Sequence, residues 1–246
     1  MRTLRVALAQ INTAVGDLEG NSKKVVEYAE RARDAGADLV AFPELTLPGY
    51  PPEDLVLYPG FVADGRTHLM EVSTSIQGTS AVIGFIGGND DHKSTMHNSA
   101  ALVSEGNIIN IYDKIFLPNY GVFDEKRYFS SGDGPCVVEL NGIRVGLTIC
   151  EDMWHYGPVE ESVAAGAEII ININASPFSI DKADQRETHI VSKRAKQNAL
   201  PILYLNMVGG QDELVFDGNS TVFDNNGNTI FRAAEFKEGL FEAHLD

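Results

Sequence analysis

The sequence predicts an α/β fold in which mixed sheets are covered by helices. Strand-like apolar runs alternate with segments whose apolar residues recur at helical spacing. Two hairpin signals, the segment 105–107 and Asn141-Gly142, interrupt this alternation by joining neighbouring apolar runs. No Pro/Gly/Ser-rich linker divides the 246 residues, and 43% of them are hydrophobic, so we expect one domain over residues 1–246 with its own core.

The first part of the chain reads as alternating strands and helices. The first helix has apolar residues at helical spacing, with Asn21 or Ser22 as the expected N-cap and Gly36 as the stop. The second strand is a short apolar run that ends at Pro43-Glu44. These expected elements are strands over residues 5–11, 38–42 and 81–87, and helices over residues 21–35 and 61–76.

From residue 98 onward, the strand-like runs are more often joined by Gly- or Asn-containing turns. A further hairpin turn over residues 224–228 joins the last two runs. The expected strands cover residues 98–103, 108–113, 137–140, 144–149, 168–172, 201–206, 220–223 and 229–231, and the expected helices cover 159–165 and 182–198.

The composition argues against several classes of function. The formal net charge is −16, from 35 acidic and 19 basic residues, and such a surface repels nucleic-acid phosphates. No apolar stretch is long enough for a membrane helix, and no cleavage-site pattern follows the first residues. The two cysteines do not resemble a disulfide framework, so we expect a location in the reducing cytoplasm. The six histidines show no metal-ligand spacing, so we expect no metal.

Three polar side chains each follow the end of an expected strand: Glu44, Lys114 and Cys150. Taken singly, each has an ordinary interpretation, as a helix-capping glutamate, a solvated lysine and a small buried hydrophobe. Glu151 and Asp152 beside the cysteine would even raise the pKa of its thiol, so a reactive thiolate needs a nearby cation. Because ligands of α/β sheets bind at the carboxyl ends of strands, the three together indicate a site with a cysteine nucleophile.

Four blocks of sequence resemble the nitrilase superfamily of carbon–nitrogen hydrolases. They are AFPELTLPGYPPEDL (41–55), YDKIFLPNYGVFDEKRYFSSG (112–132), GLTICEDMW (146–154) and INASPFS (173–179). With GGQDELVFDGNS (209–220), they most resemble the glutaminase, or amidotransferase, domains of glutamine-dependent NAD synthetases. The resemblance covers essentially the whole chain and implies a four-layer αββα sandwich.

The resemblance also implies catalytic roles. Cys150 would attack the side-chain amide of glutamine, and Glu44 would take the thiol proton and later activate water to hydrolyse the thioester. Lys114 would stabilise the oxyanion together with a backbone N–H, expected to be that of Glu151. Glu125 matches a second glutamate of the family that orients the lysine and the leaving group, while a surface carboxylate beside Lys126 and Arg127 is the less favoured alternative. No cofactor is implied for this reaction.

Substrate contacts are implied for Tyr120, which fits a position lining the glutamine pocket, and for Tyr50 as a further pocket residue. Ser176 and Lys182 fit positions that hold the α-amino and α-carboxylate ends of glutamine. Asp181 stands where the family usually has glycine, so Arg186 is an alternative carboxylate ligand to Lys182.

The chain shows no Ser-Gly-Gly-x-Asp-Ser type phosphate loop of the kind that an ATP-dependent NAD synthetase domain carries. The motifs therefore favour a glutaminase domain that works with a C-terminal or separate synthetase domain. A stand-alone amidase or ω-amidase acting on another small amide is the alternative, and a catalytically silent scaffold is a third hypothesis. The resemblance also implies a homo-oligomer.

Overall fold

The first of two large sheets has its parallel strands at the centre. The computed structural model describes residues 3–88, 96–180 and 185–245. β1, β2 and β3 run parallel to one another, while β14, β4 and β5 pair antiparallel, in the order β14-β1-β2-β3-β4-β5. The strands are β1 (Leu4–Gln10), β2 (Leu39–Ala41), β3 (Ser80–Gly88), β4 (Met96–Ser104), β5 (Asn107–Asp113) and β14 (Gly239–Leu245).

The second sheet repeats this plan in the order β13-β12-β9-β8-β7-β6. Its three central strands are parallel, and its outer strands pair antiparallel. The strands are β6 (Cys136–Leu140), β7 (Ile143–Ile149), β8 (Ile169–Asn174), β9 (Ile202–Asn206), β12 (Thr221–Phe223) and β13 (Thr229–Arg232). β8 is covered on both faces, so every residue of its sequence IIININ is buried, including Asn172 and Asn174.

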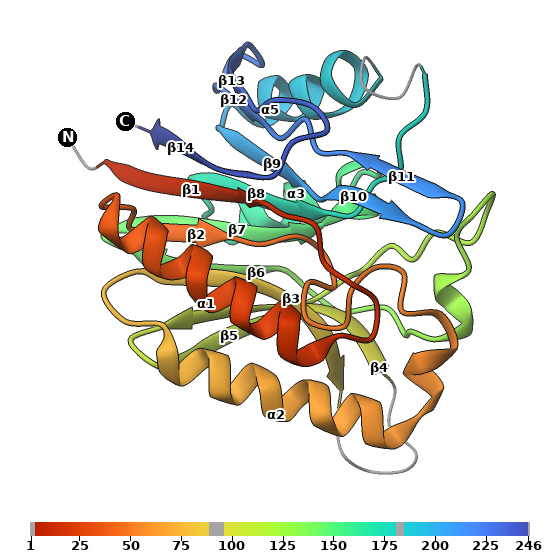
Figure 1. Ribbon diagram of the computed structural model, residues 1–246. Helices are drawn as coiled ribbons and strands as arrows, with labels where there is room; N and C mark the ends of the chain where they lie inside the picture. The colour runs from red at the N-terminus through yellow and green to blue at the C-terminus, as the bar shows by residue number, and fades with distance from the viewer. Residues whose placement is uncertain (1–2, 89–95, 181–184, 246) are drawn as a thin grey trace.

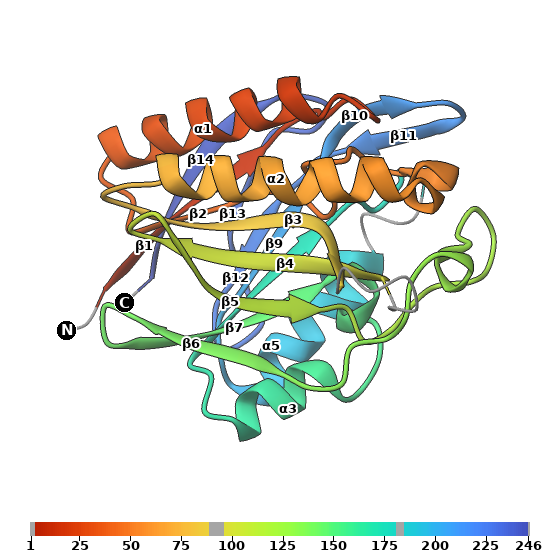
Figure 2. The same cartoon turned by 90° about the horizontal axis from the view of Figure 1, so that it is seen from below.

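Helices cover the outer face of each sheet. α1 (Leu18–Asp34) and α2 (Pro59–Ser75) pack on the first sheet, and α3 (Pro158–Ala164) and α5 (Ser192–Asn198) pack on the second. Figures 1 and 2 show the resulting order of helices, sheet, sheet and helices. This arrangement confirms the four-layer αββα sandwich that the resemblance implied. Shorter helical segments are η1 (Glu53–Leu57), η2 (Glu125–Arg127), η3 (Cys150–Met153) and the π-helical η4 (Gln185–Val191).

The core between the two sheets is built from both of them. Leu8 and Leu102 of the first sheet and Leu147, Ile171 and Leu203 of the second lie in one buried cluster. Burying a leucine or isoleucine side chain contributes roughly 1.5–3 kcal/mol, so this layer is a main source of stability. Its packing holds the carboxyl ends of the parallel strands of both sheets in fixed relation.

Most of the expected elements are present with ends shifted by one to three residues, but the N-cap of α1 is wrong. The helix begins at Leu18, and Asp17 caps it by accepting a hydrogen bond from the Gly20 N–H at 2.9 Å. Asn21 instead bonds the backbone of Ala14 and donates to the Leu47 carbonyl at 2.9 Å. The Asn21 side chain, which fits an N-cap by its sequence position, instead holds the loops at Ala14 and Leu47 together. The first residues of the expected helix at 182–198 lie outside the described residues.

Three strands are missed by the sequence patterns: β14 and the hairpin of β10 (Val208–Gln211) and β11 (Leu214–Asp217). β10 contains two glycines, which argue against a strand in sequence. In the structure Gly209 has a φ of +131°, and a Cβ there would lie 2.2 Å from the Asn12 side-chain oxygen, so the close approach explains the glycine. The hairpin projects from the body of the molecule (Figure 1).

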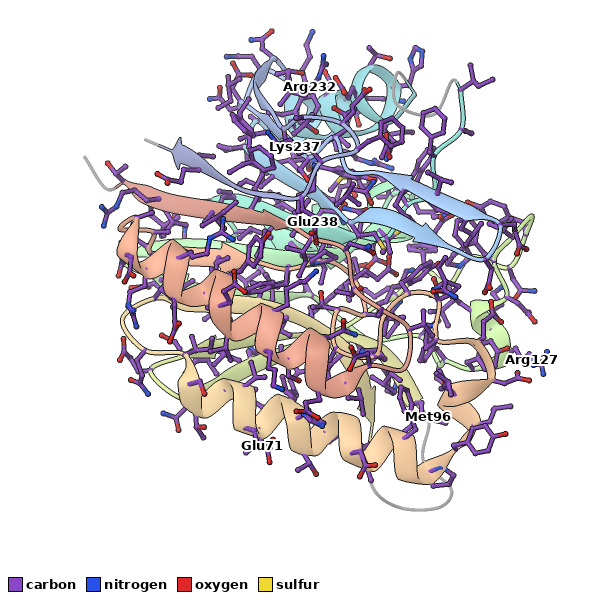
Figure 3. All side chains as sticks on the ribbon, viewed as in Figure 1. Glu71, Met96, Arg127, Arg232, Lys237 and Glu238 are labelled. Carbon is purple, nitrogen blue, oxygen red and sulfur yellow. The ribbon has the colours of Figure 1, made fainter. Side chains whose placement is uncertain are left out.

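Charged side chains cover the outside of the sandwich. Glu71 on α2, Arg127 in η2 and Arg232 on β13 are exposed and labelled in Figure 3. Glu238 accepts a hydrogen bond from Lys24 at 2.9 Å and so ties the segment before β14 to α1. Among the helices of the described ranges, none has the length and apolar character needed to cross a membrane.

Candidate active site

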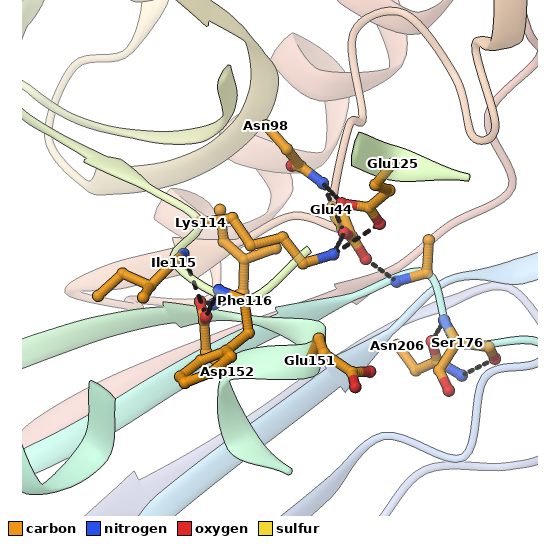
Figure 4. A network of polar contacts seen from close by, with 12 residues as sticks. Glu44, Asn98, Lys114, Ile115, Phe116, Glu125, Glu151, Asp152, Ser176 and Asn206 are labelled. Carbon is orange, nitrogen blue, oxygen red and sulfur yellow. Dashed lines mark hydrogen bonds and ion pairs between the residues drawn. The ribbon is translucent and has the colours of Figure 1, made fainter. Parts of the chain in front are cut away.

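Polar side chains from both sheets meet at one end of the sandwich. Glu44 lies three residues after β2, while Lys114 directly follows β5 and Cys150 directly follows β7. β5 runs in the same direction as β2 and β3, because two antiparallel steps separate it from β3. Glu44 and Lys114 are in direct contact (Figure 4), and the charges of both act on the Cys150 thiol, so the structure brings together the three residues that the strand ends indicated.

Lys114 is the centre of this cluster. Its ammonium donates to Glu44 Oε1 and to Glu125 Oε1, each at 2.7 Å. The exposed fractions of the three side chains are 0%, 0% and 8%, so the interaction is shielded from water. Asn98 from β4 donates to Glu44 Oε1 at 2.7 Å and to Glu125 Oε2 at 3.4 Å. Glu125 is therefore a buried partner of the lysine rather than a surface carboxylate.

Glu44 is also fixed from the second sheet. Its Oε2 atom accepts a hydrogen bond from the backbone N–H of Ala175, just after β8, at 2.9 Å. With Lys114 and Asn98 on the other oxygen, the carboxylate has little freedom to rotate. Oε2 accepts one hydrogen bond and keeps a further lone pair, and a free lone pair is what a general base requires.

The pKa values show how charge is distributed in this buried group. Burial alone would lower the pKa of Lys114, but Glu125 and Glu44 outweigh it and raise that pKa well above its ordinary value. Burial raises the pKa of Glu125 to about 7, against the opposing effect of Lys114. Burial, and then Glu44, raise the pKa of the Cys150 thiol, while Lys114 lowers it. The lysine is charged and the thiol is protonated until a base takes its proton.

Cys150 occupies a tight turn. It is 4% exposed, begins the short helix η3 and has a φ of +45°, in the left-handed region that non-glycine residues rarely adopt. Holding such a residue costs on the order of 1–3 kcal/mol, which the surrounding packing supplies. The next N–H, that of Glu151, belongs to the first turn of η3, where backbone donors have no partner within the helix.

A second polar cluster follows the cysteine directly. Glu151 is only 7% exposed, and its two oxygens accept hydrogen bonds from the Tyr120 hydroxyl, each at 3.0 Å. One of these oxygens also lies 3.0 Å from His155 Nε2, and the His155 ring stacks on Phe116 at 4.3 Å between centroids. The sequence indicated a role for the Glu151 backbone N–H, but its side chain was interpreted only as raising the thiol pKa. The i,i+4 spacing of Glu151 and His155 was the available signal for this contact.

The proposed pocket residues have different surroundings. Tyr120 is 58% exposed. Tyr50 is 4% exposed, and with Glu125 it lines a small cavity of about 30 Å³. Ser176 is buried, and both its backbone N–H and its carbonyl bond the Asn206 side chain, at 2.8 and 3.2 Å. Burial raises the pKa of the Tyr50 hydroxyl, which therefore stays protonated.

The two candidate carboxylate ligands are not equivalent. Lys182 lies outside the described residues. Arg186 is 2% exposed and forms a bidentate ion pair with the buried Asp217. Because Asp217 already neutralises this guanidinium, the structure argues against Arg186 as a ligand for a substrate carboxylate. Both cysteines, Cys136 and Cys150, are free thiols. No cluster of three or more metal-ligating side chains occurs among residues 3–88, 96–180 and 185–245.

Comparison with known sequences gives matches over nearly the whole chain. The family model described as carbon–nitrogen hydrolase matches residues 5–246. The chain is 45% identical over 252 residues to a glutamine-dependent NAD(+) synthetase of Thermotoga maritima, and 41% identical over 248 residues to that of Aquifex aeolicus. These matches cover 100% and 99% of this chain but 42% of either relative. The chain thus spans less than half the length of these curated relatives.

Solved structures give the same picture. Glutamine-dependent NAD+ synthetase from Acinetobacter baumannii, in complex with ADP, superposes with a TM-score of 0.95 at 38% identity, over 99% of this chain and 46% of that one. A mutant amidase from Nesterenkonia sp. AN1 superposes with a TM-score of 0.87 at 26% identity, over 98% of this chain and 90% of that one. That amidase carries the acetamide moiety of fluoroacetamide added covalently at its active-site cysteine.

Proposed function

Because the chain belongs to the carbon–nitrogen hydrolase family, we propose that it hydrolyses the side-chain amide of glutamine to glutamate and ammonia through a Cys150 thioester. The observation that carries this proposal is the fully buried Lys114 held between Glu44 and Glu125, at the strand ends where Cys150 lies. A buried cation between two carboxylates is costly to assemble, and such groups are concentrated at functional sites.

The first step is attack of the Cys150 sulfur on the amide carbon. Since burial raises the pKa of the thiol, Glu44 takes the thiol proton as the C–S bond forms. The developing oxyanion is stabilised by the Lys114 ammonium and the Glu151 N–H. Glu44 then passes the proton to the amide nitrogen, the C–N bond breaks, and ammonia leaves a γ-glutamyl thioester.

Hydrolysis of the thioester uses the same groups. Glu44 takes a proton from a water molecule, the water oxygen attacks the thioester carbon, and the sulfur leaves as the proton returns to it. Glu125 orients Lys114 through both steps by accepting its second hydrogen bond. Tyr120, Tyr50, Ser176 and Lys182 are the proposed contacts to the remainder of the glutamine molecule.

The names of the curated relatives support glutamine, rather than another amide, as the proposed substrate. Both curated relatives above are named glutamine-dependent NAD(+) synthetases, and this chain matches 42% of each. We therefore include an ATP-dependent NAD synthetase domain, on the same or another chain, as the recipient of the ammonia. No cofactor is required for the glutaminase steps. A homo-oligomer and a cytoplasmic location complete the proposal, the latter supported by the two free thiols.

The test is glutamate release from glutamine, with and without an added synthetase domain. Cys150→Ala is expected to abolish turnover, and Glu44→Gln to reduce it by a factor of about 10²–10⁴, the usual contribution of a general base. Intact-mass measurement after treatment with a diazo-ketone analogue of glutamine should show one adduct, which Cys150→Ala lacks. A well-folded protein without glutamine turnover or labelling under either condition would contradict the proposal.

A stand-alone amidase is the second candidate, and one observation favours it. The Nesterenkonia amidase, of which this chain covers 90%, shares the fold over nearly its whole length. Turnover of short aliphatic amides above that of glutamine, lost in Cys150→Ala, would select this alternative. A higher rate with glutamine would exclude it.

A further inference from the structure

Asp152 lies two residues after Cys150 and is a fully buried carboxylate. Four donors surround it. Its Oδ1 atom accepts hydrogen bonds from the N–H groups of Ile115 and Phe116 at 3.1 and 2.8 Å. Its Oδ2 atom accepts hydrogen bonds from the Ile149 N–H at 3.0 Å and the Tyr112 hydroxyl at 2.8 Å.

These partners come from both sheets and stand next to the reacting groups in the chain. Ile115 and Phe116 directly follow Lys114, at the end of β5 in the first sheet, whereas Ile149 directly precedes Cys150, at the end of β7 in the second. Figure 4 shows Asp152, which belongs to η3, in contact with Ile115 and Phe116 beside Lys114. One side chain therefore connects the backbone that carries the lysine to the backbone that carries the thiol.

We propose that Asp152 is a positioning residue that fixes the backbone of Lys114 relative to that of Cys150, so that the lysine ammonium is placed to meet the oxyanion. The part that concerns the oxyanion rests on the function proposed above. Asp152 has no role in proton transfer here, because all four of its contacts are to donors that hold it in place.

The donor set favours an ionised carboxylate, because three of the four partners are backbone N–H groups that can only donate. A carboxylate accepts at both oxygens, but an asparagine would turn its NH₂ group toward at least one of these N–H groups and lose that hydrogen bond. Burial raises the pKa of Asp152 to about 6, and the hydrogen bonds from Phe116 and Ile149 oppose that rise. At neutral pH the residue is thus mostly ionised, which matches its four donors.

The experiment compares Asp152→Asn with Val103→Ala, a core substitution on β4 well separated from the site in the strand register. Four quantities are measured on both variants, once circular dichroism shows that each is folded. These are kcat and KM for glutamine, the thermal midpoint, and the pH dependence of Cys150 alkylation by iodoacetamide, read from the mass of its peptide. The charged groups that act on this thiol are Glu44, Lys114, Glu125 and Glu151.

For Asp152→Asn we expect a 10- to 100-fold lower kcat, a KM within about threefold of the original, and an alkylation profile shifted to higher pH by half a unit or more. The displacement of Lys114 from the sulfur outweighs the loss of the Asp152 charge, which alone would shift the profile to lower pH. Val103→Ala is expected to lower only the thermal midpoint. An unshifted profile in folded Asp152→Asn, with a loss of kcat no larger than in Val103→Ala, would overturn the proposal.

Two arms keep the test decisive. If Asp152→Asn does not fold, Tyr112→Phe removes one of the four donors and retains the other three; a smaller upward shift supports the proposal, and an unchanged profile overturns it. If the original protein does not hydrolyse glutamine, the alkylation profile still reports the geometry. A shifted profile then supports the positioning role while the glutamine assignment fails.

Discussion

Replacing Lys114 by methionine tests the buried charge cluster most directly. Methionine keeps most of the volume but removes the ammonium that Glu44 and Glu125 share at 2.7 Å each. Removing one partner of a buried ion pair typically costs about 3–5 kcal/mol of unfolding free energy, because a charge is left without compensation. We expect a loss in this range at pH 8.5.

The same substitution should make stability more dependent on pH. Glu125 already has a pKa of about 7, and loss of Lys114 raises it further. Above pH 7 the native variant then retains a proton that the unfolded chain has released, so its stability falls as pH rises. At about 1.4 kcal/mol per pH unit for one proton, the deficit relative to the original protein grows by about 2 kcal/mol between pH 7 and 8.5.

Urea denaturation followed by circular dichroism at pH 6.5 and 8.5 measures both effects. The matched control is Lys23→Met, since Lys23 is 75% exposed and pairs with Glu19 across one helical turn. We expect no measurable change from that control. A deficit for Lys114→Met that is equal at the two pH values, or no larger than that of the control, would refute the account of the buried cluster.

Three further predictions concern neighbouring groups. Arg186→Met should lower the free energy of unfolding by about 3–5 kcal/mol, because the buried Asp217 charge loses its partner. The KM for glutamine should change less than threefold, and a tenfold rise in KM would restore Arg186 as a carboxylate ligand. Tyr120→Phe removes the hydrogen bonds to Glu151 and should raise KM by about 3–10-fold at similar kcat, whereas an unchanged KM would exclude this contact from substrate binding. Burial raises the pKa of both thiols, that of Cys136 to about 11, but within the described ranges only Cys150 has a cation, Lys114, that lowers its thiol pKa. Peptide mass spectrometry at pH 8 should therefore show slower alkylation of Cys136 than of Cys150, and equal rates would contradict this.

The apolar patterns of the sequence predicted strands and helices correctly where short-range periodicity and burial decide the structure. The apolar runs at residues 38–42 and 144–149 correspond to β2 and β7 because a strand buried between layers needs continuous apolar side chains. Patterns failed where a distant contact decided the outcome. Asn21 has the chemistry of a cap, but the loop carbonyls of Ala14 and Leu47 bind it instead.

The candidate site divides in the same way. Glu44, Lys114 and Cys150 were found because each follows a strand, and the ends of such strands meet at one edge. Asn98 was not found, because a buried asparagine within a strand has no distinctive spacing. Its role depends on the pairing of β4 with β3 and β5, which sets it beside Glu44 and Glu125.

Periodicity and residue type over short stretches were enough to predict the α/β class, most of the strands and helices, and the three residues at strand ends. The packed fold was needed to show that Lys114 is shared by two buried carboxylates, that Asp217 neutralises Arg186, and that Asp152 links the two sheets. Burial and the geometry of charges depend on residues far apart in the chain, such as Glu44 and Lys114 at a separation of 70 positions, which meet only when strands pair and elements pack.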